Sequence, residues 1–150
     1  MKTIADMLKE HPFFAELTSD KIALISSCAK NVHFRAGEKL AEAGDDAGIF
    51  FLLRSGDVAL SMQGAKGPFL FQTLHAHDIV GTSWLIPPYH WTCSATAQTP
   101  TAALAFDGTC LRGKCEKDHN LGYTLMKHLL SIMVKREESL KLHILDIYGR

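Results

Sequence analysis

The sequence predicts a mainly β domain, an antiparallel sandwich or roll, with helices at both ends. Between residues 31 and 106, short apolar runs alternate with turns that contain glycine, paired aspartates or paired prolines. Before and after this stretch, apolar residues recur at intervals of three and four, the period of a helix face. Short strands with regularly placed turns favour antiparallel pairing over the strand–helix–strand units of a parallel sheet.

The first thirty residues carry the first helical pattern. The segment Thr18–Asp20 is a plausible N-cap, and we expect a helix from there through Ala29. The apolar residues at helical spacing are Phe13, Phe14, Leu17, Ile22, Leu24 and Ile25.

Seven apolar runs follow, each bounded by turn residues. The expected strands are 32–34, 48–54, 57–62, 69–74, 79–80, 93–97 and 101–106.

The C-terminal part returns to a helical pattern. We expect a short helix near 111–117 and then one long helix of about 25 residues. Its apolar positions are Leu121, Leu125, Leu129, Met133, Leu140, Ile144 and Ile147. The whole chain is therefore expected to form one domain, 1–150, with helices in 1–30, the β region in 31–106 and helices in 109–147.

Composition excludes several classes of partner. The formal net charge is zero, whereas sequence-independent affinity for nucleic acid comes from Lys and Arg that neutralise phosphates, so direct DNA binding is not expected. No apolar run approaches the roughly 20 residues of a membrane span, so no membrane association is expected. The N-terminus lacks the apolar stretch of a secretory signal, which indicates the cytoplasm.

The cysteines and histidines carry no clear metal pattern. Cys28, Cys93, Cys110 and Cys115 form no CxxC pair, and in a cytoplasmic chain we expect reduced thiols. Cys110 and Cys115 are five residues apart, which is not a same-face helical spacing. The run from His75 to His77 is interpreted as turn or surface histidines rather than a metal site.

Catalytic motifs are also absent from the sequence. It contains no Ser-His-Asp order, HExxH, P-loop or paired-carboxylate spacing. The sequence therefore predicts a protein that is not an enzyme.

The residues from His11 to Leu60 resemble a known family. The stretches HPFFAELTSDKIALI, FRAGEKLAEAGD and IFFLLRSGDVAL are similar to the front half of cyclic-nucleotide-binding domains of the Crp–Fnr type. The resemblance implies a jelly-roll-like β-roll, a double-stranded β-helix of eight strands, with an N-terminal helix and a long C-terminal helix. It also implies glycine turns at Gly37, Gly44 and Gly56, where a positive φ would make alanine costly.

The family's phosphate-binding cassette is expected just after Asp78. In the family, a Gly-Glu dipeptide opens a short helix whose N–H groups bind the phosphate, and an Arg-Ser or Arg-Thr segment follows. Gly81 matches, the glutamate falls on Thr82 or Ser83, and the arginine falls on Trp91 or His90, before Thr92. We therefore expect the helix start to be kept and both charged groups to be lost, so that cyclic nucleotides bind weakly.

Two interpretations of the cassette stay open. The aromatic residues Trp84, Tyr89 and Trp91 either fill a degenerate pocket or stack on an altered effector. In the second case, polar side chains of Thr82, Ser83 and His90 would fix the orientation of the effector. On the long helix, Lys135–Glu138 is either a solvated face or the source of a cation for the ligand. The candidate ligand-binding residues are Gly81, Thr82, Ser83, Trp84, His90, Trp91, Thr92 and Arg136.

The sequence thus predicts a ligand-sensing regulatory module without a certain cofactor. Its effector would be a small molecule, with a cyclic nucleotide as the low-affinity case. The resemblance implies a homodimer through the long helix, on which Met126, Met133, Leu140 and Ile147 are spaced by seven. The last residues resemble the hinge that precedes a winged helix-turn-helix, so the output is expected to pass to a separate protein partner. The alternative is a ligand-free structural or interaction protein with a filled pocket.

Overall fold

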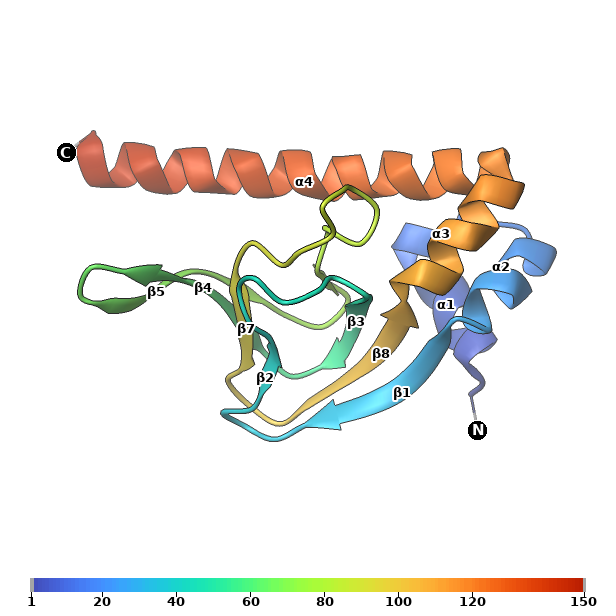
Figure 1. The fold of residues 1–150 in the computed structure, drawn as a ribbon, viewed down its shortest axis with the longest axis horizontal. Helices are drawn as coiled ribbons and strands as arrows, with labels where there is room; N and C mark the ends of the chain where they lie inside the picture. Colours follow the sequence, from blue (N-terminus) through green and yellow to red (C-terminus); the bar gives the residue numbers. More distant parts are fainter. Residues whose placement is uncertain (1, 150) are drawn as a thin grey trace.

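The computed structural model describes residues 2–149 and shows eight strands between two groups of helices (Figure 1). The N-terminal helices are α1 (Ile4–Glu10), the 3-10 helix η1 (Pro12–Phe14) and α2 (Ser19–Ser26). The strands are β1 (Ala29–Phe34), β2 (Lys39–Ala41), β3 (Ile49–Ser55), β4 (Val58–Gly64), β5 (Gly67–Leu74), β6 (Ile79–Val80), β7 (Ser94–Ala97) and β8 (Thr101–Asp107). Helices α3 (Gly108–Lys117) and α4 (His119–Tyr148) follow.

The strands form two antiparallel four-stranded sheets, which confirms the predicted jelly-roll-like roll. One sheet has the order β1-β8-β3-β6 and the other β2-β7-β4-β5. Seven strands coincide with the predicted apolar runs. Strand β2 was not predicted because three residues are too few to show an alternating pattern, and only one of the three is buried.

The turn glycines have the predicted backbone conformation. Gly37, Gly44 and Gly56 have φ values of 91°, 93° and 91°. At Gly56 a Cβ atom would also lie 2.5 Å from the carbonyl oxygen of Pro100. The turn between β3 and β4 therefore requires glycine for both its φ and its close approach to the β7–β8 turn.

The core has two parts. The first lies between the helices and the β1-β8-β3-β6 sheet, where Phe50 stacks on Phe106 and on Trp84, with ring centroids 4.8 Å apart in both pairs. The second fills the inside of the roll and includes Phe51 and Trp91. The fold therefore buries aromatic side chains on both faces of β3, as expected for a strand in the centre of a closed roll.

Helix α2 ends earlier than predicted, at Ser26 rather than Ala29. The hydroxyls of Ser26 and Ser27 donate to the carbonyls of Ala23 and Leu24, and such bonds compete with continued helix formation. Ala29 instead begins β1. Thr18 is the N-cap residue, but its side chain makes no capping hydrogen bond.

Helix α4 is longer than predicted, with 30 residues. It begins after Asp118, whose carboxylate accepts a hydrogen bond from the backbone N–H of Leu121. It crosses the whole molecule, and its C-terminal end lies on the same side as the β4–β5 hairpin (Figure 1). Among the described residues, no helix combines the length and apolar character required to cross a membrane.

The cysteine prediction is wrong for one pair. Cys28 and Cys110 form a disulfide, while Cys93 and Cys115 are free. The two bonded residues are 82 positions apart and meet because β1 pairs with β8, directly before α3. Local spacing could not reveal a pair that only the folded sheet brings together.

Candidate functional site

The cassette segment lies beneath α4 and contains no helix. After β6, residues 81–93 form turns, bends and one isolated bridge at His90, so the predicted helix start at Gly81 is wrong. Pro87 and Pro88 supply no N–H donors, and the residue before a proline is disfavoured in the α conformation, which disfavours a longer helix here. This segment therefore presents no helix N-terminus to an anion.

Gly81 and Trp91 are packed directly against each other. Gly81 has a φ of 100°, and a Cβ atom there would lie 2.6 Å from Cη2 of Trp91. The Trp91 side chain is 7% exposed and belongs to the core inside the roll, where its ring lies 6.5 Å from that of Phe51. The indole thus occupies the space over Gly81.

Trp84 lies on the other side of the segment, in the core beneath the helices. Its side chain is 1% exposed and stacks on Phe50 with an interplanar angle of 17°. Its indole Nε1–H has no hydrogen-bond acceptor among the described residues. In this conformation Trp84 is a core residue and presents no surface to a ligand.

The remaining cassette candidates lie near the surface. Thr82 and Ser83 are half-buried, whereas His90 and Thr92 are exposed. The backbone of His90 pairs with Asp46 in an isolated bridge. Thr82 borders a mainly apolar groove of about 490 Å³ between the cassette and α4, which Leu85 and Met133 also line.

Arg136 joins α4 to the roll. Its guanidinium is half-buried and donates a hydrogen bond to the carbonyl oxygen of Ile79 at the start of β6. Burial lowers the pKa of Arg136, while the nearby carboxylate of Asp78 favours its charged form. The group also lies close enough to Cys93 on the cassette to influence that thiol, whose pKa burial raises. The structure therefore places the guanidinium of Arg136 beside the cassette.

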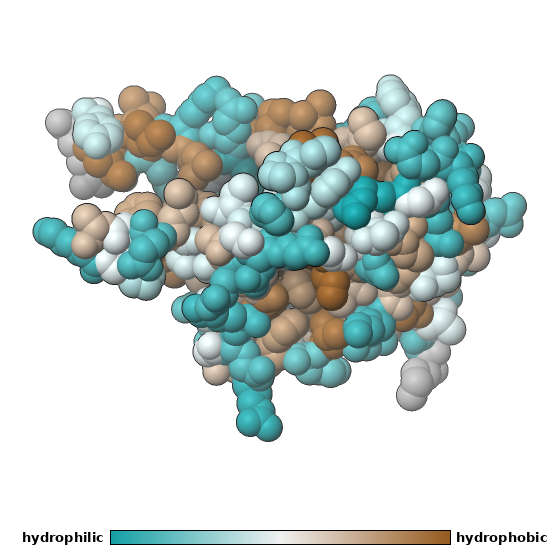
Figure 2. Space-filling model, viewed as in Figure 1, coloured by the Kyte–Doolittle hydropathy of each residue, from teal (hydrophilic) through white to brown (hydrophobic). Residues whose placement is uncertain are grey.

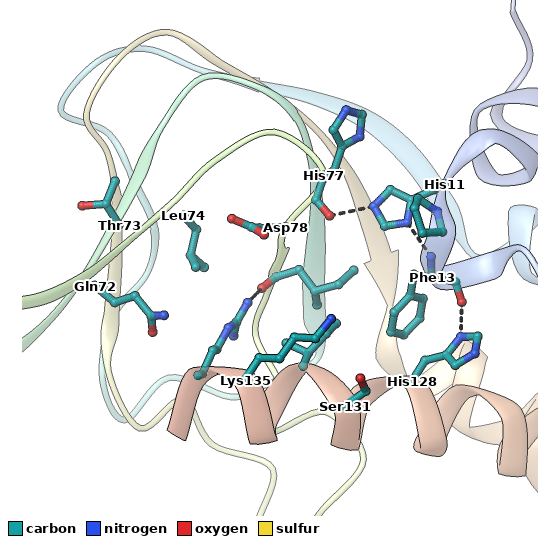
Figure 3. Close-up of a pocket in the computed structure, with 14 residues that line it drawn as sticks. His11, Phe13, Gln72, Thr73, Leu74, His77, Asp78, His128, Ser131 and Lys135 are labelled. Carbon is teal, nitrogen blue, oxygen red and sulfur yellow. Dashed lines mark hydrogen bonds between the residues drawn. The ribbon is translucent and has the colours of Figure 1, made fainter. Parts of the chain in front are cut away.

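A cavity of about 470 Å³ lies next to Arg136, between α4, the end of β5 and η1, and both polar and apolar side chains line it. In the close-up, Lys135 and Ser131 rise from α4, and Gln72, Leu74 and Asp78 lie across the space (Figure 3). The ammonium of Lys135 has no partner among the described residues. Of the eight candidate residues from the sequence, only Arg136 lines this cavity.

Two histidines that the sequence analysis did not select hold one wall of the cavity. His11 Nδ1 accepts a hydrogen bond from the N–H of Phe13, and Nε2 donates to the carbonyl oxygen of His77 at 2.6 Å. Burial lowers the pKa of His11, and both bonds are those of the neutral ring. His128 of α4 donates from Nδ1 to the carbonyl oxygen of Phe13. The sequence carries one signal for His11. It stands directly before Pro12, a residue type that often begins a helix, so its side chain could be expected to cap that helix.

Arg112 of α3 holds the cassette from below. Its guanidinium donates to the carbonyl oxygen of Trp84 and lies 4.2 Å from the centroid of the Tyr89 ring. No motif in the sequence marks Arg112, because its partners are 28 and 23 positions earlier and become neighbours only through the fold. Within residues 2–149, no group of three or more His, Cys, Asp or Glu side chains is placed to hold a metal ion.

Comparisons with known proteins agree with this fold. Residues 31–118 match the family model described as the cyclic nucleotide-binding domain. A solved structure from Geobacter metallireducens GS-15, described as a cyclic nucleotide-binding protein, is 28% identical, with a TM-score of 0.82 over 91% of this chain and 98% of that one. No curated protein sequence matches the chain significantly.

Two further solved structures share the fold at lower identity. A cyclic nucleotide-binding domain from Methylobacillus flagellatus KT is 19% identical, with a TM-score of 0.81 over 96% of this chain and 82% of that one. The regulatory domain of Toxoplasma gondii PKA, solved with cAMP, is 14% identical, with a TM-score of 0.68 over 91% of this chain and 49% of that one.

Proposed function

Because this chain belongs to the cyclic nucleotide-binding domain family, we propose that it is a non-enzymatic regulatory module that senses a small effector between its roll and α4. The observation that carries the proposal is the contact of Arg136 with the carbonyl of Ile79. An effector with an anionic or acceptor group would compete with this carbonyl for the guanidinium. Because Arg136 belongs to α4, a change of its partner would shift the helix.

The cassette is proposed to be degenerate for cyclic nucleotides. Thr82 or Ser83 stands where the family has its glutamate, and Trp91 fills the space over Gly81. Removing one partner of a buried charged pair costs roughly 2–5 kcal/mol, so losing two such groups would weaken a micromolar site to about millimolar or weaker. Cyclic AMP and cyclic GMP would therefore be poor effectors.

The cavity beside Arg136 is the proposed effector site. It offers two cations from α4, Lys135 and Arg136, and one carboxylate from Asp78. The two cations would favour a small molecule that carries an anionic group as well as some apolar surface. The cassette candidates Thr82, Ser83, His90 and Thr92 would contribute only if Trp91 moved away from Gly81.

Output is proposed to pass through α4 to a second copy of the chain and then to a separate protein partner, with no direct contact to DNA. Helix α4 exposes many apolar side chains, and brown patches are visible along the top of Figure 2. Those spaced by seven, Met126, Met133, Leu140 and Ile147, are between 36% and 65% exposed. Glu137, which would disfavour a dimer if unpaired, forms an ion pair with Lys141 at 2.8 Å.

Sedimentation tests this dimer. The protein is expected to sediment as a dimer, and Met133→Glu is expected to yield monomers with an unchanged circular dichroism spectrum. Glu138→Lys alters a charge at an exposed position of the same helix and should leave the dimer intact. A monomeric wild type would contradict this part of the proposal.

Titration tests the sensor itself. Cyclic AMP, cyclic GMP and cyclic di-GMP are added while tryptophan fluorescence is followed, and native mass spectrometry searches the purified protein for a retained small anion. A retained anion, or a saturable response in the millimolar range, that Arg136→Ala abolishes and Lys141→Ala does not supports the proposal. Unchanged affinity in Arg136→Ala excludes the role of Arg136.

One observation favours a second candidate, a ligand-free interaction protein. Trp91 already fills the recess, and Arg136 is satisfied by Ile79 without any ligand. Flat traces with every probe, together with no retained molecule, favour this candidate over the sensor.

A further inference from the structure

The disulfide between Cys28 and Cys110 joins the two ends of the roll to the helices that flank it. Cys28 lies between α2 and β1, and Cys110 lies in the first turn of α3. The backbone around the bond is already paired, since the N–H of Asp107 donates to the carbonyl of Cys28 at 2.8 Å. The roll can therefore keep its register with the bond open. The bond adds a covalent link at the first turn of α3, which is also held by the hydrogen bond from the N–H of Gly108 to the carbonyl of Gly48 and by the buried Leu111.

Helix α3 connects this bond to the cassette. Arg112, two residues after Cys110, donates to the carbonyl of Trp84 and covers the ring of Tyr89. At its other end, α3 is separated from α4 by Asp118 alone. A change in how the first turn of α3 is held would therefore act on the cassette through Arg112 and on the start of α4.

The bond is open to small thiols from one side. Cys28 is 6% exposed, but Cys110 is half-buried, and both line a surface cavity of about 400 Å³. Lys30 and Asp107 also border that cavity. The other two cysteines, Cys93 and Cys115, form no disulfide in the described part of the chain.

We propose that the Cys28–Cys110 disulfide is a redox switch that controls the order of the cassette through α3 and Arg112. A thiolate such as that of glutathione attacks Sγ of Cys110, forms a mixed disulfide and expels the thiolate of Cys28, which takes up a proton. A second glutathione thiolate attacks the mixed disulfide, releases Cys110 as a thiol after protonation and leaves as oxidised glutathione. Two electrons pass to the protein disulfide, and two glutathione thiols are oxidised.

Thiol counting and hydrogen exchange test this switch in the full chain. Without reductant, two of the four cysteines should react with a thiol reagent under denaturing conditions, and all four after treatment with dithiothreitol. Reduction should leave the far-ultraviolet circular dichroism unchanged and speed amide exchange in residues 82–92 by at least about tenfold, as expected for a local opening. The double variant Cys28→Ser/Cys110→Ser should match the reduced protein, and Cys93→Ser should match the oxidised one.

A second variant places Arg112 on the same path. Arg112→Gln should raise exchange in residues 82–92 in the oxidised protein, and reduction should then add little. Equilibration with glutathione completes the test, because a switch must open in an excess of reduced glutathione, whereas a purely structural disulfide resists it. Any one of four results would overturn the proposal. These are four reactive thiols before reduction, a bond that glutathione does not open, unfolding of both the reduced protein and the serine variant, or unchanged amide exchange after reduction.

Discussion

The packing of Trp91 on Gly81 makes a prediction that can be measured as a coupling energy. Gly81→Ala should destabilise the fold for two separate reasons. The backbone φ of 100° lies outside the range that alanine tolerates, which costs at least about 1–2 kcal/mol. The new Cβ would also lie 2.6 Å from Cη2 and 3.0 Å from Cζ2 of Trp91, and overpacking of this kind costs roughly 1–3 kcal/mol. The expected loss is therefore about 2–5 kcal/mol.

The two contributions separate in a double-mutant cycle. Trp91→Phe removes the outer ring atoms that the new Cβ would strike, so in that background Gly81→Ala should retain only its backbone cost. The expected coupling is thus about 1–3 kcal/mol. Gly37→Ala is the matched control, because Gly37 has a φ of 91° but nothing within 4 Å of its Cβ position. Urea unfolding followed by far-ultraviolet circular dichroism gives all the free energies. If Gly81→Ala costs no more than Gly37→Ala, or if its cost is unchanged by Trp91→Phe, the indole does not occupy the space over Gly81.

Three further predictions concern stability. Burial lowers the pKa of His11 below its ordinary 6.5, so the unfolded chain takes up the proton first and the free energy of unfolding should decrease as pH falls below about 6.5. His11→Asn keeps an acceptor for the N–H of Phe13 and should flatten this decrease, as measured by urea unfolding at several pH values. His33→Asn, at an exposed site, should leave the decrease unchanged. If both variants show the same dependence of stability on pH, His11 is not its cause. Trp84→Phe removes apolar area, but it also removes a buried N–H without an acceptor, whose burial costs about 1–3 kcal/mol. The free energy of unfolding, measured in urea, should therefore change by only about 1 kcal/mol. A loss above about 3 kcal/mol would show that the N–H has a hydrogen-bond partner. Asp107→Ala removes the N-cap bond to α3 and should cost about 1 kcal/mol by thermal unfolding, with no loss if the cap is unimportant.

The fold could be predicted because its signals are local. Turn glycines such as Gly56 mark where strands must end, and the period of apolar residues separates strands from helices. Resemblance then supplied the roll. The predictions were less reliable at helix ends, where the hydroxyls of Ser26 and Ser27 end α2 before Ala29.

The candidate site was harder to predict because its contacts are distant in sequence. Arg136 was selected from its place on the long helix, but its partner, the carbonyl of Ile79, belongs to the backbone and has no sequence signal. The Cys28–Cys110 bond depends on the pairing of β1 with β8. Arg112 meets Trp84 because β3 pairs with both β8 and β6, after which α3 and the cassette begin. The short helix expected at Gly81 came from resemblance alone, and the structure has turns and bends there.

The central claim is that the cassette has exchanged its charged phosphate-binding groups for a packed indole. Calorimetric titration of cyclic AMP and cyclic GMP into the wild type and into Thr82→Glu/Trp91→Arg tests it most directly. The account predicts no saturation of the wild type below about 1 mM, and tighter binding by the variant in which both charged groups are restored. Micromolar binding of either nucleotide by the wild type, held with Trp91 in place, would contradict the account.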